Sequence, residues 1–254
     1  MAVKAPVAPA AAPYNWTGFY AGANIGGGWG SRGVDYSAND PLSGSLIIGG
    51  GLPPQSFDTS GALGGLQIGY NWQFNRNWLV GIETDFNWSG IKGSASNTTL
   101  LGGTQSVTSS ADERIKWFGT VRVRAGYLPT SNLLVFVTGG FAYGQIDHSG
   151  NFANNGPLTI VGVSAPFALS CGAGFTCFTG ASSDTATGWT LGGGLEYALW
   201  KNLTVKAEYL YVSLDGKSVT VTAGTLPGSL PVSYNANFDR TNLNVARLGV
   251  NYRF

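Results

Sequence analysis

The stretch WLVGIETDFNW, residues 78–88, alternates between two kinds of side chain at every step. The even positions are apolar or aromatic apart from one threonine: Trp78, Val80, Ile82, Thr84, Phe86 and Trp88. The odd positions are Leu79, Gly81, Glu83, Asp85 and Asn87. Because successive side chains of a β-strand point to opposite faces, this alternation predicts a strand with one apolar and one polar face.

The same period extends along most of the chain. Between residues 114 and 127, one predicted face carries Ile115, Trp117, Gly119, Val121, Val123, Ala125 and Tyr127. The opposite face carries Arg114, Lys116, Thr120, Arg122, Arg124 and Gly126. In all, the pattern predicts eight strands, at roughly 16–29, 61–72, 78–89, 113–127, 133–146, 187–200, 203–214 and 239–254.

The predicted connections alternate between long and short. Short turns follow the second, fourth and sixth strands, and the long connections fall at 30–60, 90–112, 147–186 and 215–238. These long connections are rich in Gly, Ser, Thr and Asn. Short turns at one end and long loops at the other are typical of transmembrane β-barrels, and an even strand number places both termini at the short-turn end.

Composition excludes two other classes of protein. Charged residues make up 11% of the 254 residues and the net charge is +1, so the chain lacks the dense basic surface that nucleic-acid binding requires. The longest run of large apolar residues spans 133–137, whereas a membrane-spanning helix needs about 20 apolar residues. The chain is therefore expected to be all-β: one eight-stranded antiparallel transmembrane β-barrel, an up-and-down meander.

The tryptophans indicate which side of this barrel meets lipid. All eight lie at or near predicted strand ends: Trp16, Trp29, Trp72, Trp78, Trp88, Trp117, Trp189 and Trp200. Indole rings gather at the two membrane interfaces, where one edge is apolar and the N–H meets polar groups. A soluble barrel with its apolar face inward is the alternative. It has no interface to explain the aromatic positions, and glycines such as Gly65 and Gly69 crowd the polar face, as a narrow interior requires.

The predicted interior holds charges of both signs. They are Glu83, Asp85, Arg122, Arg124, Glu196, Lys206, Glu208, Arg247 and Arg253. Buried charges are costly unless they are paired, so these side chains are expected to form an ion-pair network. An eight-stranded barrel is just wide enough for its side chains to fill, which favours a sealed interior. A narrow ion pathway is the alternative, and conductance in planar bilayers separates the two.

The two ends of the chain carry further signals. Residues 1–15 are rich in Pro and Ala, and we interpret them as the flexible start of a mature exported protein, ahead of a barrel at 16–254. The opening NWTGFYAGANIGGGWG and the ending RLGVNYRF resemble the alphaproteobacterial outer-membrane surface antigens, which include outer membrane immunogenic proteins, porin family proteins and related opacity-type small barrels.

The resemblance covers residues 16–254 and carries several expectations. It implies an abundant surface protein of the Gram-negative outer membrane with no catalytic site and no cofactor, in contact with outer-membrane lipid and lipopolysaccharide. Both termini would face the periplasm and the long loops the outside, where host or environmental molecules could bind. It also implies that the outer-membrane assembly machinery recognises the last strand through Leu248, Val250, Tyr252 and Phe254.

Cys171 and Cys177 are the only cysteines. Export through an oxidising compartment favours a disulfide between them, and closing so short a loop would stabilise the fold by about 2 kcal/mol. A zinc site normally requires four ligands, which this pair does not supply.

His148, the single histidine, lies between Asp147 and Ser149. Neighbouring strand residues face opposite ways, so these three cannot form a catalytic triad. Some proteins of the resembled family bind haem, and His148 is the candidate ligand here, although an ordinary histidine at the base of an external loop is the simpler interpretation. The glycine runs at 26–33 and 49–54 lack the lysine and helix of a phosphate loop and are interpreted as turns.

Overall fold

The computed structural model describes residues 14–48, 51–102, 105–155, 160–162, 165–167, 176–223 and 232–254. Its elements, in chain order, are β1 (Gly18–Ala38), α1 (Pro41–Ile48), β2 (Gln55–Gln73), β3 (Trp78–Ser89), β4 (Lys92–Gly102), β5 (Gln105–Thr130), β6 (Leu133–Asn154), β7 (Ile160–Gly162), β8 (Ala165–Phe167), β9 (Thr176–Ala198), β10 (Leu203–Leu214), β11 (Lys217–Ala223), β12 (Ser233–Phe238) and β13 (Thr241–Arg253). No helix among them is long and apolar enough to cross a membrane.

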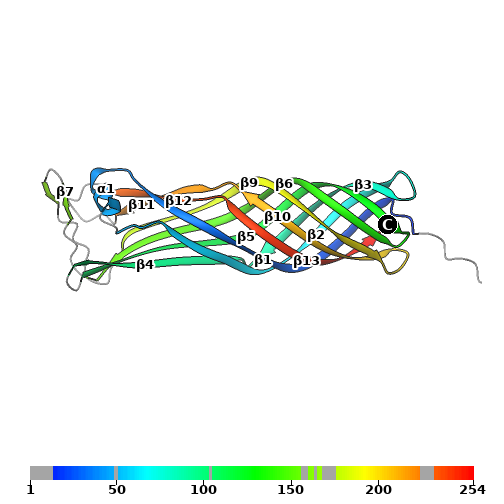
Figure 1. Ribbon diagram of the computed structural model, residues 1–254, viewed down its shortest axis with the longest axis horizontal. Helices are drawn as coiled ribbons and strands as arrows, with labels where there is room; N and C mark the ends of the chain where they lie inside the picture. The colour runs from blue at the N-terminus through cyan, green and yellow to red at the C-terminus, as the bar shows by residue number, and fades with distance from the viewer. Residues whose placement is uncertain are drawn as a thin grey trace, which may run out of the picture.

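Eight strands close into an antiparallel barrel (Figure 1). Around the ring, the order is β1, β2, β3, β5, β6, β9, β10 and β13, and each strand pairs with its neighbours. The first and last strands complete the ring, with a register that runs from Tyr20 opposite Arg253 to Trp29 opposite Asn244. The barrel is thus the predicted up-and-down meander.

The wall continues beyond this ring. β4, β11 and β12 extend the lines of β3, β10 and β13 after short breaks at residues 90–91, 215–216 and 239–240. In this second ring, β12 pairs with β1 and β11, β11 pairs with β9, and β4 pairs with β5 and β2. We call the ring nearest the chain termini the proximal tier, and its continuation through β4, β11 and β12 the distal tier.

The long external loops predicted from the sequence are therefore largely wall. β1 runs to Ala38, β2 starts at Gln55, β5 at Gln105 and β9 at Thr176, and β6 runs to Asn154. The predicted strands stopped where outward-facing apolar residues stop. In the structure the strands continue beyond these points. Polar and apolar residues still alternate there, but the apolar residues now face inward.

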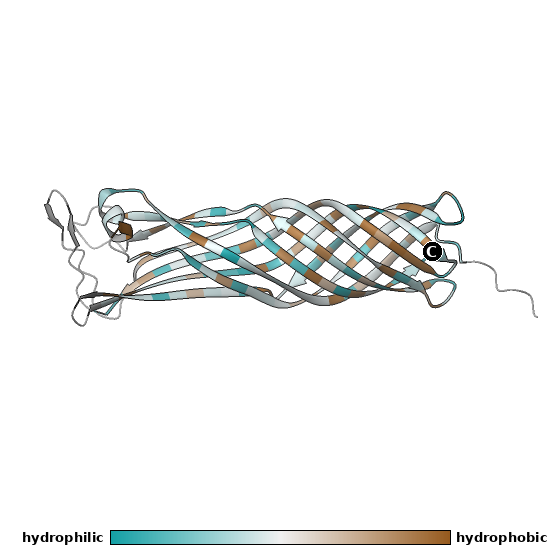
Figure 2. Ribbon diagram, in the orientation of Figure 1, coloured by the Kyte–Doolittle hydropathy of each residue, from teal (hydrophilic) through white to brown (hydrophobic). Residues whose placement is uncertain are grey.

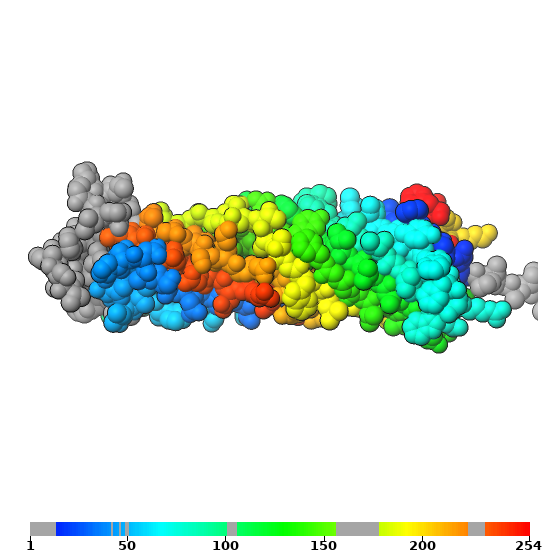
Figure 3. Space-filling view, turned by 90° about the horizontal axis from the view of Figure 1, so that it is seen from above, coloured from blue at the N-terminus to red at the C-terminus, as the bar shows by residue number. Residues whose placement is uncertain are grey.

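The two tiers expose opposite chemistry. Figure 2 shows that hydrophobic residues are more frequent along the strands of the proximal tier than along those of the distal tier. In the proximal tier, outward side chains are large and apolar, such as Val123 at 66% exposure and Val137 at 64%. In the distal tier, the outward positions of β6 are Gln145, Asp147 and Ser149, while the inward neighbours Ile146 and Phe152 are buried. The space-filling view shows both tiers as parts of one elongated cylinder (Figure 3).

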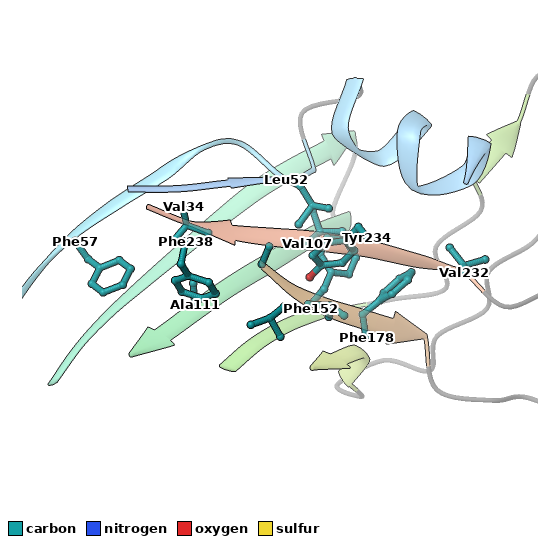
Figure 4. Close-up of a cluster of buried hydrophobic side chains, with 13 residues drawn as sticks. Val34, Leu52, Phe57, Val107, Ala111, Phe152, Phe178, Val232, Tyr234 and Phe238 are labelled. Carbon is teal, nitrogen blue, oxygen red and sulfur yellow. The ribbon is translucent and has the colours of Figure 1, made fainter. Parts of the chain in front are cut away.

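Apolar side chains fill the distal tier (Figure 4). Phe152 and Phe178 meet edge to face, with ring centroids 5.7 Å apart, and Phe178 also contacts Tyr234. The whole cluster, which we call the distal core, is Val34, Leu52, Phe57, Val107, Ala111, Phe152, Phe178, Val219, Val221, Val232, Tyr234, Ala236 and Phe238. The distal tier therefore has the polarity of a soluble barrel, with apolar side chains inside and polar side chains outside.

A β-bulge shifts the alternation of β5. The register with β6 slips between Ile115 and Trp117, so one extra residue enters β5. Ile115 is consequently buried inside, whereas Trp117 remains on the outer face, and Arg114 and Lys116 point outward. The sequence prediction was wrong for these faces below residue 117, because strict alternation cannot reveal a bulge.

Local signals explain α1 at the distal end. The Asp40 carboxylate accepts a 2.9 Å hydrogen bond from the Ser43 backbone N–H, and the Ser43 hydroxyl lies 3.2 Å from the Asp40 backbone nitrogen. This is a capped helix start, and Pro41 occupies the first helical position, where its missing N–H is not needed.

Candidate functional site

The interior of the proximal tier contains a dense ion-pair network. β3 supplies Glu83 and Asp85, and β5 supplies Arg122 and Arg124, whose inward faces oppose each other across the β3–β5 ladder. Four carboxylates meet four cations, and all are buried: Glu83, Asp85, Glu196, Glu208, Arg122, Arg124, Lys206 and Arg247. We call these eight residues the lumen network.

Two arginines bridge the walls of the lumen. Arg122 contacts Asp85 at 2.9 Å and Glu208 on the far wall at 2.7 Å, and it also pairs with Glu83. Arg247 reaches Asp85 at 2.8 Å and Glu208 at 2.7 Å. The barrel walls are thus tied together by charge-assisted hydrogen bonds, which are the stronger kind.

The remaining charges complete the network. Lys206 lies 2.8 Å from Glu83, and Arg124 lies 2.8 Å from Glu196. Tyr20 donates a 2.7 Å hydrogen bond to Glu83. A Cβ at Gly69 would collide with the Tyr20 ring, so glycine is required there for this close approach. The neutral partners of the carboxylates were not predicted from the sequence: they are Tyr20, Asn87, Thr120, Thr204 and Asn251.

Arg253, predicted as a ninth member, lies apart from this network. Its guanidinium stacks over the Tyr14 ring at 4.3 Å and donates to the Lys201 carbonyl at 3.3 Å. The polar alternation placed Arg253 on the inner face, but its position at the rim gives it partners in the turn and the N-terminal segment. None of its recorded partners is a carboxylate of the described residues.

Apolar layers cover the network at both ends. On the terminal side lie Trp16, Leu79, Leu128, Leu134, Phe136 and Ala198, which we call the proximal plug. On the distal side lies a middle layer of Leu63, Ile91, Ile115, Phe118, Ala142, Ile146, Leu210, Leu214, Leu243, Val212 and Val245. The charges are therefore enclosed by apolar side chains above and below.

Trp16 departs from the predicted interfacial belt. It is 1% exposed and lies in the proximal plug, where its indole N–H donates to the Ser131 carbonyl at 3.0 Å. Six other tryptophans are exposed on the outer surface as expected: Trp29, Trp72, Trp78, Trp88, Trp189 and Trp200. Trp117 is half-buried on the same surface, with its N–H on Gln145.

A second buried polar cluster lies between the middle layer and the distal core. Arg32 of β1 pairs with Glu113 of β5, and Arg32 also donates to the Asp239 carbonyl. His148 of β6 places its Nδ1 3.4 Å from Glu113 and stacks on the Phe238 ring at 4.4 Å. The sequence did not predict Arg32 as an interior residue because 30–60 was assigned to a loop. Glu113 lies in the predicted strand 113–127, but strict alternation through the bulge put it on the outer face.

His148 is thus an inward strand residue, 3% exposed, rather than a histidine at the base of an external loop. Burial lowers its pKa to about 4, and the nearby Arg32 cation acts in the same direction. Arg32 also offsets the charge of Glu113, which would otherwise favour protonation of the imidazole. A haem ligand would have to enter the distal tier to reach this side chain. Asp147 points outward to Lys116 at 2.7 Å.

The other sites considered from the sequence are the cysteine pair, a metal site and the residues of the last strand. Cys171 lies outside the described residues, so its disulfide with Cys177 stays a prediction. No group of three or more His, Cys, Asp or Glu side chains within the described ranges is arranged to hold a metal ion. Leu248, Tyr252 and Phe254 are exposed on the outer face of the proximal end, with Phe254 at 77%.

Known proteins match this chain over nearly its full length. The 31 kDa outer-membrane immunogenic protein of Brucella melitensis is 34% identical over 260 residues, which cover 99% of this chain and 90% of that protein. The 22 kDa outer membrane protein of Rhizobium leguminosarum is 26% identical and covers 100% of this chain and 83% of its own length.

Among solved structures, the outer membrane protein OprG of Pseudomonas aeruginosa is similar at 12% identity, with a TM-score of 0.47 and coverage of 95% of this chain and 99% of OprG. The family described as outer membrane protein beta-barrel domain matches residues 2–254. With that match and the 34% identical relative, the chain belongs to the outer-membrane β-barrel family that includes the immunogenic proteins of alphaproteobacteria.

Proposed function

We propose that this protein is a non-catalytic surface protein whose proximal tier spans the outer membrane while its distal tier stands outside the cell. One observation carries the proposal: outward side chains change from apolar to polar along the same strands. Apolar outward faces require lipid and polar ones require water. Trp29, Trp88, Trp117 and Trp189 lie where this change occurs, and the chain termini face the periplasm.

Epitope insertion tests this orientation. One epitope follows Asn155 at the distal end of β6, and the matched control lies at Asn202 in the turn between β9 and β10. Antibody should label intact cells only for the Asn155 insertion, and should label both after permeabilisation. Labelling of the Asn202 epitope on intact cells would reverse the assignment of sides.

A sealed lumen supports a surface role over conduction. The lumen carboxylates are engaged by cations, and the proximal plug and middle layer close both ends with apolar side chains. In planar bilayers we therefore expect no discrete conductance steps at micromolar protein. Stepwise currents that change in Arg122→Gln would favour a narrow ion pathway through the network instead.

The exposed C-terminal side chains fit a signal read during assembly. Leu248, Val250, Tyr252 and Phe254 share the outer face of β13 and its end. To separate this role from a merely interfacial one, Phe254→Ala is compared with Phe74→Ala, an aromatic residue 50% exposed in the turn after β2. We expect only Phe254→Ala to lower outer-membrane levels several-fold, while both variants refold equally in detergent. Equal effects would leave Phe254 as an interfacial aromatic alone.

A further inference from the structure

The chain turns across the terminal mouth of the barrel before it enters the wall. β1 begins at Gly18, whose φ of +142° strongly favours glycine, and no other described residue has a positive φ. A Cβ there would lie an ordinary 3.5 Å from the Phe254 carbonyl oxygen, so the backbone conformation rather than crowding requires glycine. The residues before this turn, which we call the strap, are 14–17, and their Trp16 ring is buried in the proximal plug.

The strap is attached on opposite sides of the barrel. Beside β1, the Trp16 backbone N–H donates to the Gln73 side-chain oxygen at 3.1 Å, and the Gln73 backbone N–H donates to the Thr17 hydroxyl at 3.0 Å. The Trp16 indole N–H reaches the Ser131 carbonyl, in the turn between β5 and β6, at 3.0 Å. Three strands separate β1 from β6 in either direction around the ring, so Trp16 spans the mouth from one wall to the opposite one.

The strap also contacts the last strand. Arg253, at the end of β13, places its guanidinium 4.3 Å from the centroid of the Tyr14 ring, and the Tyr14 ring meets the Trp16 ring edge to face at 4.8 Å. Both geometries are favourable for aromatic rings. β13 pairs with β1 along the ladder that closes the barrel, which we call the seam. The strap thus connects both strands of the seam to the opposite wall.

The contacts of the strap depend on closure of the ring. In a flat sheet, four interstrand steps of about 4.8 Å would put β6 roughly 19 Å from β1, beyond the reach of a tryptophan side chain. The hydrogen bond from Trp16 to Ser131, which are 115 residues apart, therefore needs the curled wall. The stack of Arg253 on Tyr14 needs β13 beside β1. Separation of the two strands at the seam would consequently expose the Trp16 ring and break both contacts.

We propose that the strap holds the seam closed: it folds over the mouth after β1 and β13 pair, and it then opposes their separation. At this end of the barrel, turns join β2 to β3, β5 to β6 and β9 to β10, whereas no turn joins β13 to β1. The strap supplies at the seam the connection that a turn supplies at the other pairs. This role does not depend on which end of the barrel faces the cell exterior, so it goes beyond the proposed function and is tested apart from it.

Amide hydrogen exchange of the full-length refolded protein in detergent, followed by mass spectrometry, tests the strap. In Trp16→Ala, we expect amides of the seam, residues 20–29 and 244–253, to exchange about tenfold faster because the seam opens more often. Amides of the opposite β5–β6 ladder, residues 119–127 and 135–143, should change less than about twofold. Phe136→Ala is the matched control, since it removes another buried ring of the proximal plug from within β6, and its effect should centre on β6.

Tyr14→Ala is the second variant, because Tyr14 lies outside the strands and its loss leaves the ring able to close. It should accelerate exchange at the seam several-fold, and it decides the question if Trp16→Ala does not fold. Heat-dependent gel mobility checks that each variant forms a closed barrel. Three results would overturn the proposal: unchanged seam exchange in Tyr14→Ala, equal acceleration on both walls in Trp16→Ala, or seam exchange as fast in Phe136→Ala as in Trp16→Ala. The last result would leave Trp16 as a filler of the proximal plug alone.

Discussion

The proximal and distal tiers share strands but reverse the order of polarity. In the proximal tier, the interior is charged and the exterior is apolar; in the distal tier, the interior is the apolar distal core and the exterior carries Ser, Thr, Asn and charged residues. In the proposed orientation, lipid surrounds the proximal tier and water surrounds the distal tier. The same backbone architecture is therefore stabilised by ion pairs in the proximal tier and by apolar burial in the distal tier.

Neither interior would suit the other tier. In the proximal tier, lipid surrounds the wall, so apolar side chains such as those of the proximal plug find an apolar environment on either face, and only the charged residues are restricted to the interior. Apolar burial in the distal tier gains free energy because water surrounds it. The experiments below test this contrast, from the largest expected effect to the smallest.

Arg122→Met should have the largest effect. It removes one of the two arginines that Glu83, Asp85 and Glu208 share, and breaking a buried ion pair from one side costs about 4 kcal/mol. The expected outcome is a large drop in the urea midpoint of the detergent-refolded barrel. A drop no larger than that of Arg240→Gln, an exposed cation on Asp215, would remove the network as a major source of stability.

Phe152→Ala tests the distal core. Removing this buried ring costs about 3 kcal/mol, because the cavity that remains is only partly refilled. Since the damage is confined to the distal tier, we expect proteolysis there while heat-dependent gel mobility persists. If Phe152→Ala loses both the protease resistance of the distal tier and the heat-dependent gel mobility, the two tiers unfold as one unit.

Two lysine substitutions on one face of β9 compare the outer surfaces. Leu195→Lys introduces a charge toward lipid and should cost about 2–3 kcal/mol near the middle of the apolar band. Thr185→Lys introduces the same charge on the distal tier and should be nearly neutral. Refolding into lipid vesicles measures both. Equal effects would contradict the placement of the membrane at the proximal tier.

His148 should make the distal tier sensitive to acid. Its pKa is about 4 in the folded protein and about 6.5 when unfolded, so below pH 6.5 the unfolded chain binds the extra proton. Stability contributed by the neutral imidazole is therefore lost as pH falls from 6.5 to 4, by about 2 kcal/mol at pH 5. Arg32, Glu113, Asp147, Asp184 and Lys217 are the charged groups near it.

The measurement is protease resistance of the distal tier at pH 7 and pH 5, with His148→Gln as the control. The variant should lose most of the pH dependence. If it retains the full dependence, the acid response belongs to the neighbouring carboxylates.

Sequence patterns predicted the proximal tier well because its constraints are local. Alternation with large apolar residues marks each lipid-facing strand, so the predicted ranges 78–89 and 203–214 coincide with β3 and β10. Charges at inward positions of β3 and β5 also follow directly from the period, and the structure brings Glu83 and Arg122 together.

The distal tier was not predicted because its strands resemble loops in composition. Small polar residues alternate there with apolar ones such as Phe152 and Phe178, and the inward face becomes evident only once the ring closes. The bulge at Ile115 and the pairing of Arg32 with Glu113 depend on contacts between distant segments. No pattern within a single strand encodes them.

The length of β5 determines how far the distal end of the barrel stands from the membrane. Its 26 residues, at about 3.3 Å each and tilted near 40°, give a wall of roughly 65 Å, of which the apolar band takes about 25 Å. In the proposed orientation the strands thus carry the end bearing α1 some tens of ångströms clear of the lipid. A rigid wall of that height presents its tip to macromolecules too bulky to approach the bilayer itself, and holds it at a fixed distance.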